Sequence, residues 1–388
     1  MFKGTLKNMI EQLKTNALFK LNVVLIMFSS IFFCVCKSTE PTVPEEIDIN
    51  IVVQKCKIYN NENSGLPDNS IKALAVDNQN NLWVGMFHNG VIRFDGGSCT
   101  MYNTQNSDLP SDEIRSLAVD CNNNVWIGTD NGLAKYDDHN WMIYDTTNSP
   151  LPYHVISSLA VDNDNILWIG CGHATAGGVL SFDGSNWKLY IPENSLLPCS
   201  IIQVIHVDEK NNKWIGTGIG VGASQGGGLV KIDNNGNWSV YTKQNSELLY
   251  NSVDALTTDL EGNLWIGYKA WLYLEYGYYH GGLQKFNGQN WTDYSPHPNG
   301  VYNPEAIVSN RVSEIVCDKY GYLWIATETE WKYPYNLSLF KNGVWNNLSD
   351  IAQDFPINPF IRDIKIDKNN DVWLATKLGV ISINYSPK

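Results

Sequence analysis

The sequence predicts an all-β fold, a single seven-bladed β-propeller with four antiparallel strands in each blade. Three observations predict it: a tryptophan motif that recurs seven times, four short strand patterns in each copy, and chain ends that supply complementary parts of one blade. The composition agrees, because the 388 residues include 14 Trp, 20 Tyr and 31 Gly. Such a composition is typical of short strands and tight turns rather than of helical bundles.

The repeated motif is close to Leu-Trp-Ile-Gly, with Ala in place of Gly in the last two copies. Consecutive copies lie 42 to 59 residues apart. That period fits one four-stranded sheet per repeat. The copies are centred on Trp83, Trp126, Trp168, Trp214, Trp265, Trp324 and Trp373.

Each repeat contains four strand patterns, which we name a to d. In the second repeat they are expected at 114–120, 125–128, 133–136 and 141–144. Period-two alternation between Asn, Asp and Gly turns indicates antiparallel hairpins. An Asp closes strand a in every repeat, and we expect it to accept backbone N–H groups in the turn rather than to bind calcium.

The two ends of the chain complete one blade. The last repeat stops after its third strand, at 380–385, and the missing fourth strand pattern appears at 51–59. The N-terminal strand is therefore expected to be the outer strand of the last blade. Closing the ring in this way removes exposed sheet edges.

The N-terminal region is expected to direct export. Residues 1–36 combine lysines with an apolar run and predict a signal peptide of the lipoprotein type, with Cys36 or Cys34 as the lipidated residue. Simple secretion is the alternative. Residues 37–50 form a tether, and 51–388 form the propeller. The remaining cysteines show no framework spacing, although Cys171 and Cys199 are expected in loops where they can pair.

These repeats carry a family resemblance. The segment 63–71, Asn-Ser-Gly-Leu-Pro-Asp-Asn-Ser-Ile, is followed by Asp77-x-x-Asn-Asn-Leu-Trp-Val-Gly and by Gly90-Val-Ile-Arg-Phe-Asp. This pattern resembles the two-component regulator propeller repeat and covers 51–388 without any kinase region. The resemblance implies a periplasmic sensor-type propeller, a class in which several members sense glycan fragments.

The lengths of the connections single out one face of the ring. In a four-stranded meander the b–c and d–a connections lie at the same end of the blade. The b–c connection is long in blades 3 to 6, and the crossing from blade 5 to blade 6 is long as well. These insertions are 171–178, 217–228, 268–282, 327–336 and 295–311.

Aromatic side chains are concentrated in those insertions. Rings with polar tips suit stacking on sugars or anchoring of a protein partner. The alternative is that the long loops pack on one another as a cap. The candidate ligand-binding residues are Trp271, Tyr273, Tyr276, Tyr278, Tyr279, His280, Tyr302, Trp331, Tyr333 and Tyr335.

A second group of candidates belongs to the innermost strands. The second residue of strand a is polar in every repeat, which places a polar ring at the channel opening on the inserted face. Lys72, Arg115 and Arg362 are the cations of that ring and suit an anionic ligand such as a uronic acid or a sulfated sugar. A solvated channel wall without a ligand is the alternative.

The sequence favours a non-catalytic ligand-binding propeller, and its most favoured ligand is a carbohydrate. One alternative is a protein–protein interaction scaffold in the cell envelope; another is a glycosidase or polysaccharide lyase. No cofactor and no metal site are expected. The net charge of −13 argues against nucleic acid. The protein is expected to be exported from a bacterial cell, to be periplasmic, outer-membrane-anchored or secreted, and to touch the membrane only through its N-terminal lipid.

Overall fold

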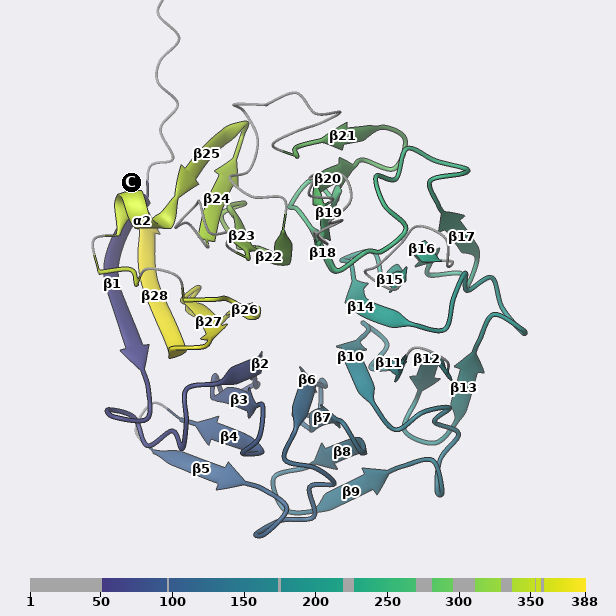
Figure 1. The fold of residues 1–388 in the computed structure, drawn as a ribbon, viewed down its shortest axis with the longest axis horizontal. Helices are drawn as coiled ribbons and strands as arrows, with labels where there is room; N and C mark the ends of the chain where they lie inside the picture. The colour runs from purple at the N-terminus through teal and green to yellow at the C-terminus, as the bar shows by residue number, and fades with distance from the viewer. Residues whose placement is uncertain are drawn as a thin grey trace, which may run out of the picture. The chain divides into compact units, whose positions relative to one another are not determined.

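The computed structural model describes residues 51–388 except 96–97, 174–175, 219–226, 270–280, 296–310, 329–336, 353 and 357–358. The described residues form seven four-stranded antiparallel sheets arranged in a ring (Figure 1). The predicted all-β, seven-bladed propeller is therefore confirmed. The predicted signal peptide, the tether, Cys34 and Cys36 lie outside the described residues. No helix within the described residues is long and apolar enough to cross a membrane.

The strands of the first four blades follow the predicted order a to d. Blade 1 contains β2 (Ile71–Val76), β3 (Leu82–Met86), β4 (Val91–Phe94) and β5 (Cys99–Tyr102). Blade 2 contains β6 (Ile114–Val119), β7 (Val125–Thr129), β8 (Gly132–Tyr136) and β9 (Trp141–Tyr144). Blade 3 contains β10 (Ile156–Val161), β11 (Leu167–His173), β12 (Ala176–Phe182) and β13 (Trp187–Tyr190). Blade 4 contains β14 (Ile202–Val207), β15 (Lys213–Gly218), β16 (Gly227–Ile232) and β17 (Trp238–Tyr241).

The remaining blades keep this order, and the last one takes its fourth strand from the other end of the chain. Blade 5 contains β18 (Ala255–Thr258), β19 (Leu264–Tyr268), β20 (Gly282–Phe286) and β21 (Trp291–Asp293). Blade 6 contains β22 (Val312–Cys317), β23 (Leu323–Thr327), β24 (Leu337–Lys341) and β25 (Val344–Asn347). Blade 7 contains β26 (Asp363–Ile366), β27 (Val372–Thr376), β28 (Gly379–Pro387) and β1 (Ile51–Tyr59).

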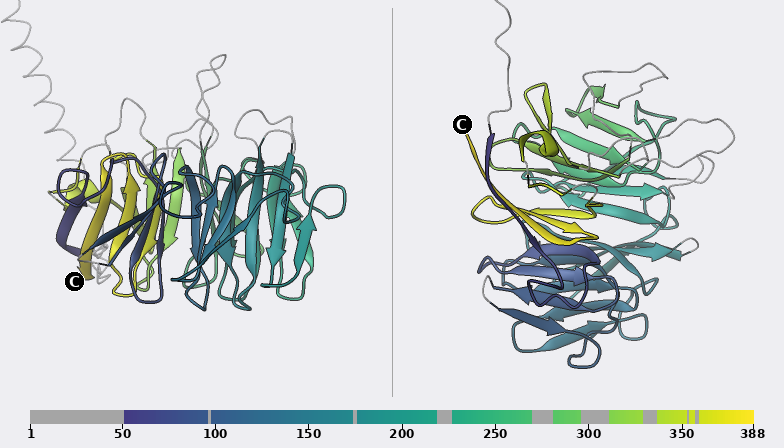
Figure 2. Two further views of the ribbon diagram at one scale, coloured as in Figure 1. Left: turned by 90° about the horizontal axis from the view of Figure 1, so that it is seen from below. Right: turned by 60° about the vertical axis from the view of Figure 1, so that its left-hand side comes forward.

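The N-terminal strand closes the ring. β1 pairs antiparallel with β28, from Ile51 opposite Pro387 to Tyr59 opposite Val380. Strand a lies nearest the axis in every blade and strand d lies at the rim (Figure 1). From the side, all sheets run between two faces of the ring (Figure 2). The apolar core fills the spaces between neighbouring blades, and Trp83, for example, packs against Ile114 and Leu117 of the next blade.

The Asp that closes strand a ties together the turn and the core of its blade. Asp77 Oδ1 accepts the N–H groups of Gln79 and Asn81, as the sequence predicted. Its Oδ2 also accepts the indole N–H of Trp83 at 3.1 Å, a bond that the sequence did not predict. The same Asp–Trp bond recurs in all seven blades, at 2.8 to 3.1 Å. Each motif tryptophan is thus satisfied by the Asp six residues before it.

Two local predictions were wrong. The insertion at 171–178 is not a loop, because β11 continues to His173 and β12 begins at Ala176, so the hairpin is simply longer. Cys171 is therefore a buried strand residue whose thiol donates to the carbonyl of Gly178, and both Cys171 and Cys199 are free thiols. The crossing from blade 6 to blade 7 also contains a short helix, α2 (Leu348–Ile351), that the strand pattern did not predict.

Candidate functional site

The b–c and d–a connections share one face of the ring, as the strand order predicted. The amide of Gly90, in the b–c connection of blade 1, donates to the carbonyl of Asp112 in the following crossing at 2.9 Å. Gly132 donates to His154 at 2.7 Å in the next blade, and Gly218 donates to Ile201 at 3.1 Å in blade 4. We call this side of the ring the insertion face.

The aromatic candidates of the insertion face lie outside the described residues. Their role therefore stays a prediction, and the structure informs only the second group of candidates, at the axial ends of the inner strands. The residues outside the described part are Trp271, Tyr273, Tyr276, Tyr278, Tyr279, His280, Tyr302, Trp331, Tyr333 and Tyr335.

Three of the seven polar residues at the second position of strand a stabilise the ring itself. The Ser157 hydroxyl donates to the carbonyls of Gly170 and Ile202, linking blades 3 and 4. Ser313 makes the equivalent link to Ile361 at 3.0 Å. The Gln203 amide donates to the carbonyl of Gly218 at 2.8 Å. These side chains are engaged with backbone carbonyls, so they are poor candidates for ligand contacts.

Lys72 and Arg362 lie together at the junction of blades 7 and 1. The Arg362 guanidinium donates to the carbonyl of Ile71 at 2.9 Å and lies 4.6 Å from the ring centre of Phe87 and 5.2 Å from that of Phe360. The Lys72 ammonium lies 5.8 Å from the same Phe87 ring. Among the described residues it has no hydrogen-bond or ion-pair partner. Sequence reasoning missed both phenylalanines, which hold the cations in place.

The environment of Lys72 disfavours its charge. Burial and, to a smaller extent, the positive charges of Lys269, Arg115 and Arg362 together lower its pKa to about 8, against an opposing effect of Asp363. A half-buried ammonium close to other positive charges is stabilised by an incoming anion, because the anion replaces interactions that the ammonium lost with water.

Arg115 is the third cation of the group, and it is already paired. Its guanidinium makes a two-pronged contact with Asp130, with the Nη2–Oδ2 distance at 2.8 Å. The neighbouring carboxylate of Asp130 raises the pKa of Glu113. Arg115 therefore adds positive charge near Lys72 but has less free hydrogen-bonding capacity than Lys72.

Blades 5 and 6 carry a separate group of charged residues, most of which form ion pairs with one another. Asp254 accepts the amide N–H of Lys269 at 2.8 Å, and burial raises the pKa of its carboxyl to about 6. Glu328 pairs with Arg311 at 2.7 Å and lies 4.0 Å from the ammonium of Lys269. These charges are paired with one another, whereas Lys72 has no ion-pair partner among the described residues.

A second group of charged residues follows the second position of strand a in blades 6 and 7. It consists of Glu314, Asp363 and Lys365. The Lys365 ammonium contacts Asp363 at 2.6 Å, and Asp363 in turn accepts the backbone N–H of Leu74 at 2.8 Å. Burial raises the pKa of Glu314 to about 7, although Lys365 opposes this rise. Sequence reasoning missed these residues. An alignment of the seven repeats finds them, because most other blades carry Ala, Ser, Val or Thr at these positions.

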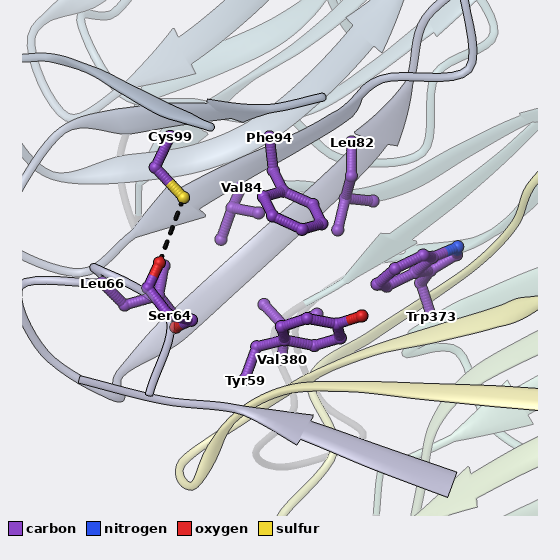
Figure 3. Close-up of a pocket in the computed structure, with 9 residues that line it drawn as sticks. All are labelled: Tyr59, Ser64, Leu66, Leu82, Val84, Phe94, Cys99, Trp373 and Val380. Carbon is purple, nitrogen blue, oxygen red and sulfur yellow. Dashed lines mark hydrogen bonds between the residues drawn. The ribbon is translucent and has the colours of Figure 1, made fainter. Parts of the chain in front are cut away.

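An apolar pocket lies between blades 7 and 1 (Figure 3). Tyr59, Phe94 and Trp373 line it, and the thiol of Cys99 points across it to the carbonyl of Ser64 at 3.2 Å. Its volume is about 10 Å³, which is room for about one water molecule. Since none of the described residues that line it is charged, this pocket is a packing gap rather than a chemical site.

Comparisons with known proteins bear on the family and the fold. The model of the family described as "Two component regulator propeller" matches residues 65–88, 150–173 and 306–329. A search of curated proteins found no match.

Solved structures with the same fold differ in what they do. One is the extracellular domain of a putative hybrid two component system from B. thetaiotaomicron, at 20% identity and a TM-score of 0.62, covering 86% of this chain and 42% of that one. Virginiamycin B lyase from Staphylococcus aureus matches at 14% identity and a TM-score of 0.61, covering 86% of this chain and 99% of that one. PorZ, a surface component of the type-IX secretion system of Porphyromonas gingivalis, matches at 17% identity and a TM-score of 0.59, covering 82% and 47%. This chain thus spans about two fifths of the sensor domain, and identities this low show the fold alone.

Proposed function

We propose that this chain, three segments of which match the two component regulator propeller family, is an exported ligand-binding propeller that recognises an acidic extracellular glycan on its insertion face. The observation that carries the proposal is the half-buried Lys72 ammonium, which has no ion-pair partner among the described residues and feels the positive charges of Lys269, Arg115 and Arg362. A carboxylate or sulfate of a sugar supplies the missing partner.

The ligand is proposed to approach along the axis from the insertion face. Its anionic group contacts Lys72 and the outer edge of the Arg362 guanidinium, while Phe87 and Phe360 keep the two cations in place. The predicted rings of the long insertions, led by Trp271 and Trp331, then stack on the neighbouring sugar units. Charge contributes selectivity for acidic glycans, and the rings contribute affinity that does not depend on charge.

Calorimetric titration with matched oligosaccharides tests this proposal. Uronic-acid and sulfated fragments are expected to bind, and neutral fragments of equal length are expected to bind much more weakly. Lys72→Met is expected to weaken the acidic ligand by about tenfold, because it removes a charged hydrogen-bond donor but keeps the side-chain volume. Lys188→Met, on the exposed surface of rim strand β13, is the matched control and should bind like the wild type.

Three outcomes of the titration count against the proposal. Equal affinity for acidic and neutral fragments would show that the cations do not contribute to binding. An unchanged affinity in Lys72→Met would show that the ligand does not bind at Lys72. Trp271→Ala and Trp331→Ala separately test the stacking role of the insertions. Cleaved sugars in the same samples would favour the glycosidase or lyase alternative instead.

A further inference from the structure

The face opposite the insertion face carries a ring of turn-to-turn hydrogen bonds, which we call latches. In five blades the a–b turn places an Asn in the left-handed region, and its side-chain carbonyl accepts a backbone N–H from the a–b turn of the preceding blade. Asn123, for example, accepts from Asn78 at 2.6 Å, and Asn80 accepts from Lys368 at 2.9 Å across the point of closure. The other three latches are made by Asn165, Asn211 and Asn370.

Two blades lack this latch. Gly262 in blade 5 and Gly321 in blade 6 occupy the left-handed position, with φ of +80° and +81°, and neither has a side chain that can accept the neighbour's N–H. Blade 6 departs from the others once more, because only Asn342 and Gly343 connect β24 to β25, where the other c–d turns have four or five residues. The glycine in the a–b turn and the shortened c–d turn of blade 6 both lie at the junction of blades 5 and 6, and both leave less side chain and backbone there.

A cleft of about 410 Å³ lies at this junction. Gly321, Asn342 and Gly343 are among its lining residues, so the departures described above open it directly. Its deeper part is aromatic and buried, formed by Trp265 and Phe340. A volume of this size accommodates one large side chain together with its flanking backbone.

The open part of the cleft combines apolar surface with lysine side chains. Leu260 is 56% exposed and Tyr320 is 37% exposed, and both line the cleft. Lys285 is held by Asp259 and Glu261, each at 3.9 Å. Lys341 stacks 4.2 Å from the ring centre of Tyr322 and has no carboxylate partner among the described residues.

We propose that this cleft binds a peptide segment of a partner protein, which inserts an aromatic side chain between Leu260 and Tyr320 and places an Asp or Glu carboxylate on Lys341. Exposed apolar side chains beside a pocket with a buried aromatic floor are typical of anchor sites in protein interfaces. A sugar fits less well, because the carboxylate of Asp259 is already occupied by the N–H groups of Glu261, Asn263 and Trp265.

Capped tripeptides probe this cleft in the purified full chain. N-acetyl-Gly-Trp-Glu-amide is compared with its Gln and Ala counterparts, Gly-Trp-Gln and Gly-Ala-Glu, by ligand-observed NMR. The acidic aromatic peptide is expected to bind at least about fivefold more tightly than either counterpart. Lys341→Gln is expected to abolish the preference for Glu over Gln and to retain the preference for Trp over Ala.

Gly321→Asn is the second variant, and it has a matched control. It restores the latch to the amide of Leu260, narrows the cleft, and is expected to weaken peptide binding by at least about tenfold while keeping or raising Tm. A Cβ at position 321 would lie 3.3 Å from the Leu260 side chain, which is exposed and has room to shift. Gly262→Asn adds the equivalent latch between blades 4 and 5, outside the cleft, and is expected to leave peptide binding unchanged.

The proposal is overturned if no peptide binds, if Lys341→Gln keeps the preference for Glu, or if Gly321→Asn binds as well as Gly262→Asn. Neutral oligosaccharides that bind the wild type and lose affinity in Gly321→Asn would assign the cleft to a glycan instead. Each of these results leaves the proposed site around Lys72 untouched, because that site lies on the opposite face of the ring.

Discussion

Seven side chains share one position in the repeat, the second residue of strand a, yet their surroundings give them different roles. Ser157 and Ser313 bind carbonyls of the neighbouring blade, so their polarity serves the ring. Arg115 is paired with Asp130. Lys72 lacks an anion among the described residues, and burial with three nearby cations lowers its pKa to about 8. The residue with the least satisfied charge is the one that an anionic ligand changes most.

This lowered pKa predicts a pH dependence of ligand binding. The anion binds protonated Lys72, and the protonated fraction of the free protein falls as pH rises through about 8. Affinity for an acidic oligosaccharide is therefore expected to fall about tenfold between pH 7 and pH 9. Binding at pH 8 should also take up protons from the buffer, which titrations in buffers of different ionisation enthalpy measure. Lys72→Met should show a flat profile, and a wild-type affinity that rises with pH would contradict the assignment.

At the level of the strands, one substitution in a rim strand, strand d of blade 1, leaves a gap in the packing of that blade. In blades 2 to 6 this strand contains a Trp, which in blades 2, 3, 5 and 6 packs on the aromatic residue at the end of strand c. Trp187, for example, stacks on Phe182 at 4.1 Å, and Trp291 stacks on Phe286 at 4.2 Å. Blade 1 has Cys99 at this position, and the apolar pocket of Figure 3 lies where the indole is missing.

Filling that pocket is expected to stabilise the protein. Cys99→Trp is expected to place an indole beside Phe94 and Tyr59, as Trp187 lies beside Phe182 and Tyr144 in blade 3, and to cover apolar surface that is now open. The free energy of unfolding should rise by about 1 kcal/mol, or about 2 °C in Tm. Thermal unfolding measures this, with Cys121→Trp in an exposed turn as the matched control that gains nothing. A fall in Tm would show that the gap is too narrow for an indole.

At the level of the whole molecule, the pairing of β1 with β28 turns an open array of sheets into a ring. Ile51 joins the core of blades 6 and 7, and Tyr59 packs against Trp373 at a centroid distance of 5.9 Å. The latches between a–b turns also cross this junction, through Asn80 and Lys368. Residues from both ends of the chain therefore stabilise the same blade.

Removing β1 is expected to damage the whole ring. A chain that starts at residue 60 leaves the edge of β28 unpaired and exposes part of the blade 7 core, which should cost at least about 3 kcal/mol and favour edge-to-edge association. Thermal unfolding and size-exclusion chromatography measure the two effects. A chain that starts at residue 48 keeps β1 and is the control. A monomeric truncated protein with unchanged Tm would contradict the closing role of this strand.

Local patterns alone were enough to predict the number of blades, the four-strand order, the closing strand and the turn role of the repeated Asp. They succeed because each repeat is a self-contained hairpin unit in which strand period and turn residues are set by neighbours in sequence. The prediction failed at 171–178, because strand length there depends on pairing between β11 and β12 rather than on composition.

The sequence by itself determined the propeller and its inserted face; only the tertiary structure decided which side chains meet. Arg362 reaches the carbonyl of Ile71 across 291 residues of chain, and Phe87 joins them from a third segment. The cleft at Gly321 likewise exists only because blades 5 and 6 lie side by side without a latch. Burial, charge spacing and a missing hydrogen bond are properties of several segments brought together, so no single repeat encodes them.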